Sequence, residues 1–348
     1  MPHQFLSCDW GTSSFRLRWV AGKEVVDLFS DETGCRTIFD RAKGADRATL
    51  YAAFLNKVLN AFARDWWGEA PAEPNITAFG ERLGTKTEPA SPLGPVPPDQ
   101  VELVISGMAS SSIGWEELPY AKTPLALDAS NLVFRRLDWD KPNWLSDTYL
   151  LSGAATDDDI MRGEETEAIG LLGHAPTHAD CVLILPGTHS KHLRIRDRRI
   201  ETFRTYMTGE LFDVLTHHSI LKATIDLSRS QNSEPYWRAF DAGVNRVASS
   251  GLCGSLFQTR TRAILKQCPA GENGWFLSGQ LIAAELVEAE KKIAAVPILL
   301  GGVTRLRTLY ARALKLLGAT NFHEFDDAAV ARALPMAHAL FLEHIWKR

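Results

Sequence analysis

Long apolar stretches are missing from this 348-residue sequence. The longest apolar run, 293–300, has eight residues and contains Pro297, whereas a helix that spans a bilayer needs about 20. The first ten residues, MPHQFLSCDW, contain no basic region followed by an apolar stretch, so they lack the pattern of a signal peptide. We therefore expect no membrane partner and a cytoplasmic location.

Cysteine is scarce, and positive charge is not in excess. The five cysteines form no Cys-x-x-Cys pair, and an odd number of cysteines does not fit a disulfide framework. Lysine and arginine number 38 against 42 aspartates and glutamates, which gives a formal net charge of −4. A surface that binds duplex nucleic acid usually shows as a basic excess, so we expect reduced thiols and no nucleic-acid partner.

The overall composition is that of a folded protein with a sizeable core. Hydrophobic types make up 45% of the residues and charged types 23%, the balance of soluble globular proteins. At roughly 150 residues per domain, this length predicts two domains. The sequence does not determine the oligomeric state, and a homodimer stays open.

A pattern of three strands joined by tight turns occurs twice. In the first copy, strands are predicted at 5–10, 15–20 and 24–29, and the turn Gly11-Thr12-Ser13-Ser14 follows the first of them. In the second copy, the predicted strands are 181–186, 192–195 and 200–203, and the corresponding turn is Gly187-Thr188-His189-Ser190-Lys191. The repetition predicts a duplicated α/β domain.

Helix signals follow each copy of the pattern. Asp46 is placed to cap a helix whose apolar residues recur every four positions. Thr304 is placed to cap another, and Pro335 is expected to break or kink the last helix. The remaining predictions are helices at 279–293, 304–317 and 327–346, buried strands at 101–105 and 296–300, and a proline-rich surface loop at 85–100.

The first glycine turn, residues 11–14, has the composition of a phosphate site. Glycine lets backbone N–H groups point into a concavity and approach an anion closely, and Thr12 and Ser13 beside Gly11 add hydroxyl donors. Asp9, just before the turn, can hold Mg²⁺ through water, because magnesium prefers oxygen ligands and keeps much of its hydration shell. The alternative is a plain β-hairpin turn with a local bond from Asp9.

The second glycine turn, residues 187–191, offers Gly187, Thr188, Ser190 and Lys191 for the same purpose. Its alternative is an ordinary hairpin turn in which Lys191 is a solvated charge. Two hydroxyl-rich glycine turns at equivalent places in duplicated domains favour phosphate binding, because they would hold a polyphosphate from both sides if they faced each other across a cleft.

Two further segments offer backbone without bulky side chains at strand ends. Gly301-Gly302 follows the strand 296–300 and precedes a helix, so a flat ring or a phosphate can approach closely there; a common strand-to-helix connection is the alternative. Gly107 and Ser110 follow the strand 101–105, and ligands gather at such carboxyl ends in open α/β sheets.

An acidic run, Glu164-Glu165-Thr166-Glu167, opens a predicted helix. Acidic residues in a first helical turn favour the helix dipole, which is the simpler explanation. The sharper interpretation makes Glu164 the carboxylate that receives an alcohol proton during phosphoryl transfer. Asp159 upstream stays open as a rival for this role.

In their order, these segments resemble the sugar-kinase, Hsp70 and actin superfamily of ATP-binding proteins. The first phosphate motif of that superfamily matches DWGTSS at 9–14, the second matches PGTHSK at 186–191, and the adenosine motif matches LLGGVT at 299–304. The carbohydrate-kinase branch places a catalytic carboxylate after a glycine at a helix start. Gly163-Glu164 stands at that place, with glutamate instead of the usual aspartate.

Within the superfamily, the sequence is similar to the 2-dehydro-3-deoxygalactonokinase family over nearly its whole length. The matching stretches are DWGTSSFRLR (9–18), SGMASSSIGW (106–115), MRGEETE (161–167), PGTHSKHLRI (186–195), FRTYMTGELFDVL (203–215) and FLSGQLIAAEL (276–286). The resemblance implies an α/β fold of two ribonuclease-H-like (actin-like ATPase) domains around a nucleotide cleft. Residues 1–178 would form the sugar-acid side and 179–348 the nucleotide side, with the last helix able to return to the first domain.

The resemblance also implies a reaction, the transfer of the γ-phosphoryl group of MgATP to the 6-hydroxyl of 2-dehydro-3-deoxy-D-galactonate. Asp9 would orient Mg²⁺, and Glu164 would accept the hydroxyl proton. The sugar acid carries a carboxylate, for which a guanidinium partner is expected. The substrate candidates are Arg16, Gly107, Ser110, Arg162 and Arg204, with the three arginines unranked.

Other functions stay open from the sequence alone. A kinase for a related sugar acid would share the same motifs. An actin- or chaperone-type nucleotide switch would share the phosphate turns and phosphorylate no small molecule. A sugar-responsive DNA-binding regulator would need an added helix-turn-helix, for which we expect no room before the first strand.

Overall fold

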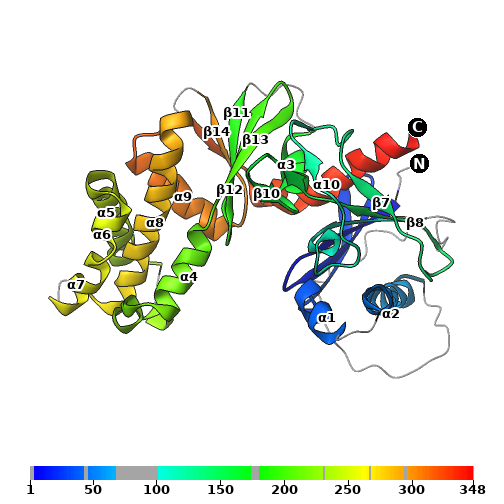
Figure 1. Ribbon diagram of the computed structural model, residues 1–348, viewed down its shortest axis with the longest axis horizontal. Helices are drawn as coiled ribbons and strands as arrows, with labels where there is room; N and C mark the ends of the chain where they lie inside the picture. The colour runs from blue at the N-terminus through cyan, green and yellow to red at the C-terminus, as the bar shows by residue number, and fades with distance from the viewer. Residues whose placement is uncertain are drawn as a thin grey trace. The chain divides into compact units, whose positions relative to one another are not determined.

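The computed structural model describes residues 4–42, 46–67, 101–173, 180–229, 232–265, 268–293 and 296–347. The predicted proline-rich loop at 85–100 lies outside these residues. The chain divides into two compact units (Figure 1): unit 1 consists of Met1–Pro176 and Ala331–Arg348, and unit 2 of Thr177–Val330. Among the helices that the structure describes, none has both the length and the apolar composition that a membrane crossing needs.

A mixed sheet forms the centre of unit 1. Its spatial order is β3 (Glu24–Asp31), β2 (Phe15–Ala21), β1 (Gln4–Trp10), β4 (Val101–Gly107), β8 (Leu145–Leu151) and β7 (Phe134–Arg136). The strands β1, β2 and β3 form an antiparallel meander, whereas β1, β4 and β8 run parallel. The carboxyl ends of β1 and β4 therefore lie side by side.

The helices of unit 1 are α1 (Cys35–Ala42), α2 (Arg47–Trp67), α3 (Glu164–Leu172) and the part of α10 (Asp327–Trp346) that begins at Ala331. The predicted cap is confirmed, because the Asp46 carboxylate accepts the Ala48 amide N–H at 3.1 Å. Of the two outcomes expected at Pro335, a break of the last helix does not occur, since α10 continues through it. Pro335 is buried, so its packing offsets the hydrogen bond that proline cannot make.

Several short elements complete unit 1. They are the 3₁₀ turn η1 (Met108–Ser110), the strand β6 (Leu125–Ala126), and a small sheet of β5 (Ala121–Lys122), β9 (Ala154–Ala155) and β10 (Ile160–Met161).

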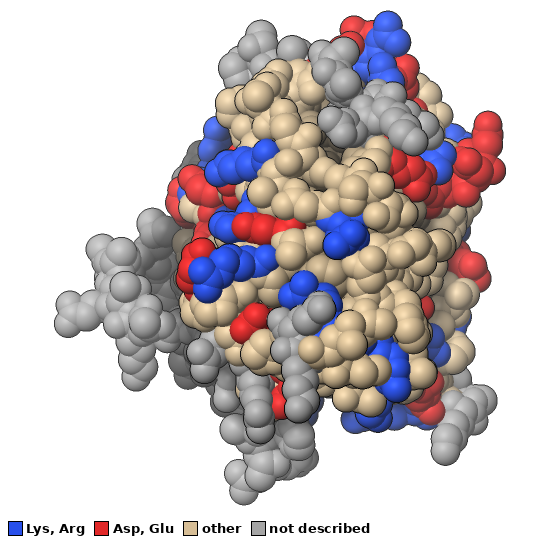
Figure 2. Space-filling model, turned by 90° about the vertical axis from the view of Figure 1, so that its left-hand side faces the viewer, with Lys and Arg blue, Asp and Glu red and all other residues tan. Residues whose placement is uncertain are grey.

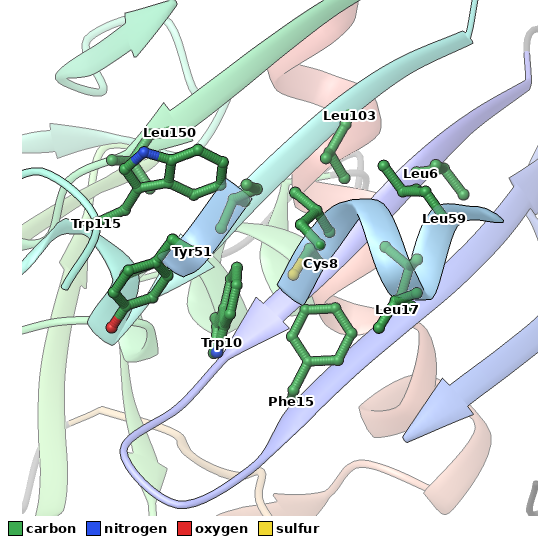
Figure 3. Packing of buried hydrophobic residues seen from close by; sticks show 14 of the residues in the cluster. Leu6, Cys8, Trp10, Phe15, Leu17, Tyr51, Leu59, Leu103, Trp115 and Leu150 are labelled. Carbon is green, nitrogen blue, oxygen red and sulfur yellow. The ribbon is translucent and has the colours of Figure 1, made fainter. Parts of the chain in front are cut away.

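The core of unit 1 lies between the sheet and α2 (Figure 3). The side chains of Leu6, Cys8 and Trp10 on β1 and of Phe15 and Leu17 on β2 are fully buried in it. Side chains alternate between the two faces of a strand, so Asp9 and Arg16, one residue away from Trp10 and Phe15, point to the opposite face. The alternation therefore separates the candidate catalytic aspartate from the apolar core.

Unit 2 repeats the sheet topology of unit 1. Its strands follow the order β15 (Phe322–Glu324), β14 (Ile298–Leu300), β11 (Cys181–Leu185), β12 (Ser190–Arg196) and β13 (Arg199–Tyr206). Again the first three strands in the sequence form an antiparallel meander, and β11, β14 and β15 run parallel. The predicted α/β class and the duplication of the three-strand pattern are confirmed.

Helices complete unit 2. They are α4 (Thr208–His218), α5 (Glu234–Ser250), α6 (Leu252–Ser255), α7 (Gln258–Ile264), α8 (Ala270–Ile293) and α9 (Thr304–Leu316), with the 3₁₀ turns η2 (Ile220–Thr224) and η3 (Leu227–Arg229). The core joins Val182 and Ile184 of β11 to Phe240 of α5 and Ile282 of α8. On the face of unit 2 that Figure 2 presents, Lys and Arg side chains are interspersed with Asp and Glu.

One predicted cap in unit 2 is wrong. The residue before α9 is Val303, and Thr304 is already the first residue of the helix. The Thr304 hydroxyl donates to the Asp327 carboxylate at 2.6 Å, so a tertiary partner takes the place of the local backbone bond.

Candidate functional site

Asp9 lies near the carboxyl end of β1, between the two neighbouring strands. In register it stands opposite Arg16 of β2 and Ser106 of β4. Its carboxylate accepts a hydrogen bond from the Arg16 guanidinium at 3.2 Å, and the two side chains are 30% and 49% exposed. Asp9 and Arg16 therefore form a solvent-accessible ion pair, and the aspartate remains within reach of a hydrated cation.

The first glycine turn is fixed by the start of α1. The Gly11 amide donates to the Ser14 carbonyl at 2.8 Å, and the amides of Cys35 and Arg36 donate to the carbonyls of Gly11 and Thr12 at 2.9 and 3.0 Å. The side chains of Thr12 and Ser13 are exposed. The turn is thus held through its carbonyl groups, while the hydroxyl groups face solvent.

Gly34 makes this support sterically possible. A Cβ at position 34 would lie 2.3 Å from the Thr12 carbonyl oxygen and 2.5 Å from the Ser13 Cα. Since any side chain would collide with backbone there, only glycine permits α1 to begin directly against the turn.

Aromatic packing lies directly behind the first turn. The ring of Trp10 is fully buried, with ring centroids 4.8 Å from both Phe15 and Tyr51, and Figure 3 shows it between these two side chains. The Tyr51 hydroxyl donates to the Ile113 carbonyl at 3.0 Å. The residue that precedes Gly11 is therefore anchored in the core.

Further predicted residues of unit 1 lie close to Asp9. A Cβ at Gly107 would lie 3.5 Å from Asp9 Oδ1, and one at Gly163 would lie 3.8 Å from the Gly107 Cα. Arg162 Nη1 donates to the carbonyl and the hydroxyl of Ser110 at 2.5 and 2.6 Å. These contacts bring the end of β1, the end of β4 and the start of α3 together.

Glu164 is the first residue of α3 and is partly exposed. Its carboxylate accepts the backbone N–H of Arg162 at 3.1 Å, which places it beside the other predicted residues of unit 1. The rival base, Asp159, lies in the turn between β9 and β10, where its carboxylate accepts the Ile160 amide at 2.7 Å.

Glu165 is a feature that the sequence interpretation passed over. It is fully buried, and its two carboxylate oxygens accept the Gly163 amide at 3.0 and 2.8 Å. Burial, and next the neighbouring negative charge of Glu164, raise the pKa of Glu165 to about 7. The helical spacing of Glu165 with Ala168, Ile169 and Leu172, all buried, was the signal that could have identified it.

The second glycine turn is supported in the same way as the first. A Cβ at Gly209, near the start of α4, would lie 2.6 Å from the Gly187 carbonyl oxygen and 2.7 Å from the Thr188 Cα. The Glu210 amide donates to the Thr188 carbonyl at 3.0 Å. Gly34 and Gly209 thus have equivalent roles. Both follow the third strand of a meander, and this shared position was the signal that could have predicted the contact of Gly34 with the first turn.

Ser190 and Lys191 are less accessible than the sequence suggested. The Ser190 hydroxyl is fully buried and donates to Glu285 of α8 at 2.7 Å. Lys191 is 4% exposed, and its ammonium group donates to the His189 carbonyl at 3.3 Å. The alternative in which Lys191 is a solvated charge is therefore wrong, because the side chain folds back over the turn.

The third glycine segment lies against the second turn. A Cβ at Gly302 would lie 3.1 Å from the carbonyl oxygen of Pro186, the residue that precedes Gly187. The Gly301 amide donates to the Ile184 carbonyl at 2.9 Å, and the Gly302 carbonyl accepts from Arg307 at 2.8 Å. Unit 2 thus brings two of the three predicted nucleotide motifs into contact.

The three candidate arginines have different surroundings. Arg16 pairs with Asp9, and the half-exposed Arg204 of β13 lies 3.6 Å from the Glu288 carboxylate in unit 2. Arg162 bonds to neutral oxygens of Ser110, and its guanidinium lies over the Tyr120 ring at 4.2 Å. Stacking of this kind orients a guanidinium without neutralising it.

The part of the chain that the structure describes contains no group of three or more His, Cys, Asp or Glu side chains arranged to hold a metal. Magnesium in phosphoryl-transfer sites is commonly bound by one or two carboxylates together with water and substrate phosphates. A single accessible carboxylate such as Asp9 fits that mode of binding.

Comparison with known proteins connects this arrangement to one family. Residues 9–337 match the family model described as 2-keto-3-deoxy-galactonokinase. A Rhizobium meliloti (strain 1021) protein assigned as a 2-dehydro-3-deoxygalactonokinase is 32% identical over 344 residues, 96% of each chain. The 2-dehydro-3-deoxygalactonokinase of Escherichia coli (strain K12) is 30% identical over 349 residues, 98% of this chain and 99% of that protein.

A solved structure agrees with these relatives. The crystal structure of a Sinorhizobium meliloti protein with the same assignment has a TM-score of 0.76 at 28% identity, covering 98% of this chain and 99% of that one.

Proposed function

Since the chain belongs to the 2-keto-3-deoxy-galactonokinase family and is therefore an ATP-dependent phosphotransferase of carbohydrate metabolism, we propose that it phosphorylates the 6-hydroxyl of 2-dehydro-3-deoxy-D-galactonate. The observation that carries this proposal is the convergence of Asp9, Gly107, Arg162 and Glu164 in unit 1. Phosphoryl transfer to a sugar acid can use one acidic group for the metal ion, a second for the hydroxyl proton, and a guanidinium for the substrate carboxylate.

The two glycine turns are the proposed phosphate contacts. Gly11, Thr12 and Ser13 in unit 1 and Gly187 and Thr188 in unit 2 would bind phosphate oxygens, with Lys191 as a nearby cation. Gly301 and Gly302 would lie against the adenosine. Because the Ser190 hydroxyl is buried and donates to Glu285, we assign Ser190 a role in supporting the turn and no contact with phosphate. That both turns serve one nucleotide within a ribonuclease-H-like pair of domains remains a prediction.

Asp9 and Glu164 would have distinct tasks. MgATP supplies the phosphoryl group and the charge that neutralises its oxygens. Asp9 would orient the hydrated Mg²⁺ through its accessible carboxylate, with Arg16 fixing the carboxylate in place. Glu164 would accept the proton of the substrate hydroxyl, a contribution on the order of 10²–10⁴-fold in rate.

Arg162 is the proposed partner of the substrate carboxylate. Its two bonds to Ser110 and its position over Tyr120 hold the guanidinium rigidly next to Gly163 and Glu164. A preorganised guanidinium loses little conformational entropy when it binds a carboxylate in a bidentate manner. The small-molecule partner would thus be oriented by its acid group, with its far hydroxyl toward Glu164, in a cytoplasmic enzyme.

A coupled assay of ADP formation tests the substrate. The galactonate-derived keto-deoxy acid should react faster, in kcat/KM, than the gluconate-derived one, and both should react far faster than a neutral hexose. Equal rates with the two acids, or a preference for the neutral sugar, would contradict the substrate and leave the family unaffected. An Arg162→Lys variant should raise KM for the acid more than KM for ATP.

A further inference from the structure

A buried carboxylate in unit 2 receives four hydrogen bonds and has no role in the proposed reaction. Glu285 of α8 is 3% exposed. Its Oε1 accepts from the Ser190 hydroxyl and from His192 Nε2, both at 2.7 Å. Its Oε2 accepts from the hydroxyls of Tyr310, at 2.7 Å, and Thr208. The donors come from β12, α9 and α4, so one side chain links three elements to α8.

This arrangement keeps the carboxylate ionised. Burial by itself would raise the pKa of Glu285, but the hydrogen bond and charge of His192 and the bonds from Thr208 and Ser190 hold its pKa below the ordinary value. A buried charge is expensive unless its hydrogen-bonding capacity is satisfied. The four donors therefore act as a set, and loss of any one leaves charge incompletely compensated.

Two of the donors connect the second glycine turn to its surroundings. Ser190 lies within the turn segment and is the first residue of β12, and Thr208 is the first residue of α4. Gly209, next to Thr208, contacts Gly187 and Thr188. The carboxylate thus joins the strand that leaves the turn to the helix that supports it. Tyr310 lies in the interior of α9 and donates to the same oxygen as Thr208.

We propose that Glu285 is a positioning residue for the second glycine turn, which holds the Gly187–Thr188 backbone in the conformation that binds the phosphates of ATP. This inference rests on the proposed function in so far as ATP is the ligand. Glu285 itself touches no substrate; it acts through Ser190 and Thr208. The neighbouring motifs PGTHSK and FRTYMTGELFDVL meet FLSGQLIAAEL, which lies far from both in the sequence, at this one carboxylate.

The test compares Glu285→Gln with the wild-type protein by calorimetric titration with MgATP in the absence of sugar acid. Glutamine keeps the shape but offers one acceptor oxygen, so the dissociation constant should rise on the order of tenfold, the scale of one lost charged hydrogen bond. In the kinase assay KM for ATP should rise by the same factor, and KM for the sugar acid should stay within about twofold.

Two single-hydroxyl variants separate positioning from general stability. Thr208→Val and Tyr310→Phe each remove one donor to the same oxygen, and both should lower the Tm. Thr208→Val should weaken MgATP binding, whereas Tyr310→Phe should leave it within about twofold. Equal effects of the two variants on MgATP affinity, or a lower Tm in Glu285→Gln with unchanged affinity, would overturn the inference.

The outcome also separates this inference from the proposed function. A wild-type protein that binds MgATP but does not phosphorylate the sugar acid would contradict the proposed substrate, and the calorimetric comparison would still decide the role of Glu285. If Glu285→Gln does not fold, the Thr208 and Tyr310 variants decide it alone.

Discussion

The two glycine turns share a backbone plan and differ in what lies behind them. In both units a glycine at or just before the next helix, Gly34 or Gly209, brings the helix start against the turn, and a following amide donates to the second turn residue. Behind the first turn stands Trp10 in an aromatic cluster. Behind the second stands the carboxylate of Glu285.

The difference shows which part of such a site is fixed by the fold. The antiparallel meander followed by a helix dictates where the turn lies and where its carbonyl groups find donors. The side chains that pack against the turn from the interior of the unit can be apolar, like Trp10, or charged, like Glu285. An aromatic cluster is stabilised by the apolar surface that it buries, which does not depend on any single hydrogen bond. A buried charge, in contrast, needs each of its hydrogen-bond donors in place. We therefore expect the two turns to respond differently to comparable substitutions.

The largest expected effect concerns chemistry, which we place in unit 1. Glu164→Gln removes the proposed proton acceptor and keeps the shape, so kcat should fall on the order of 10²–10⁴-fold. The dissociation constant for MgATP, measured by calorimetry, should stay nearly unchanged. Wild-type turnover in this variant would show that another group accepts the proton. Asp159→Asn is the matched control, because Asp159 is the rival candidate.

Removal of the aromatic support should cost the most stability. Trp10→Ala should lower the free energy of unfolding by about 3–5 kcal/mol and weaken MgATP binding, because Trp10 directly precedes Gly11. Phe62→Ala provides the control: Phe62 of α2 is buried in the same cluster and does not adjoin the turn. The Phe62→Ala variant should be less stable in urea denaturation and should keep the wild-type affinity for MgATP. Equal losses of affinity would show that the aromatic support has no specific role.

The two supporting glycines should give similar, smaller effects. Gly34→Ala and Gly209→Ala each place a Cβ within 2.7 Å of turn backbone, and forced overpacking of this kind costs about 1–3 kcal/mol. Both variants should also raise KM for ATP. Gly254→Ala is the control, because a Cβ there meets nothing within 4 Å; its Tm and KM should match or exceed those of the wild type. If one of the two supporting glycines tolerates alanine, the equivalence of the turns fails.

The smallest net effect is expected from pH, since two buried groups of unit 1 oppose each other. Burial, with Arg18 nearby, lowers the pKa of His338 to about 3, so His338 contributes stability that is lost as pH falls below about 6.5. Glu165, with its pKa raised to about 7, contributes stability that is lost as pH rises through 7. Between pH 5 and 7 each group changes the free energy of unfolding by about 2 kcal/mol. The two changes have opposite signs, so they nearly cancel.

Single substitutions should reveal the two opposed terms. His338 bonds to Ser7 of β1 at 2.9 Å and to Ser106 of β4 at 3.1 Å, and glutamine can replace both bonds in part. His338→Gln should become less stable as pH rises from 5 to 7, and Glu165→Gln should become more stable, in urea denaturation at each pH. The same slope in both variants would show that neither group has the ionisation assigned to it.

Much of the fold followed from local patterns. Alternation at 15–20 and the glycine turn before it predicted the first meander, and the apolar run 181–186 with its glycine turn predicted the second. Asp46 predicted the start of α2. These signals depend on neighbouring residues alone. At Pro335 and Thr304 a distant partner outweighed the local rule. Packing of unit 1 around α10 lets the helix continue through Pro335, where a break was one expected outcome, and the Asp327 carboxylate takes the Thr304 hydroxyl that was expected to cap α9. The strand β8 and the helix α5 were not predicted at all.

The sequence by itself determined the residue types of the candidate reactive groups of this protein and their order along the chain. Two glycine turns, Asp9 and Glu164 can be read from residue types and spacing, because turn chemistry and strand alternation are local. Tertiary structure alone decided that Glu165 and Glu285 are buried, that Ser190 faces inward, and that Arg162 lies over Tyr120. Burial and hydrogen-bond partners come from segments far apart in the chain, and no local pattern specifies which of many acidic residues is taken out of water.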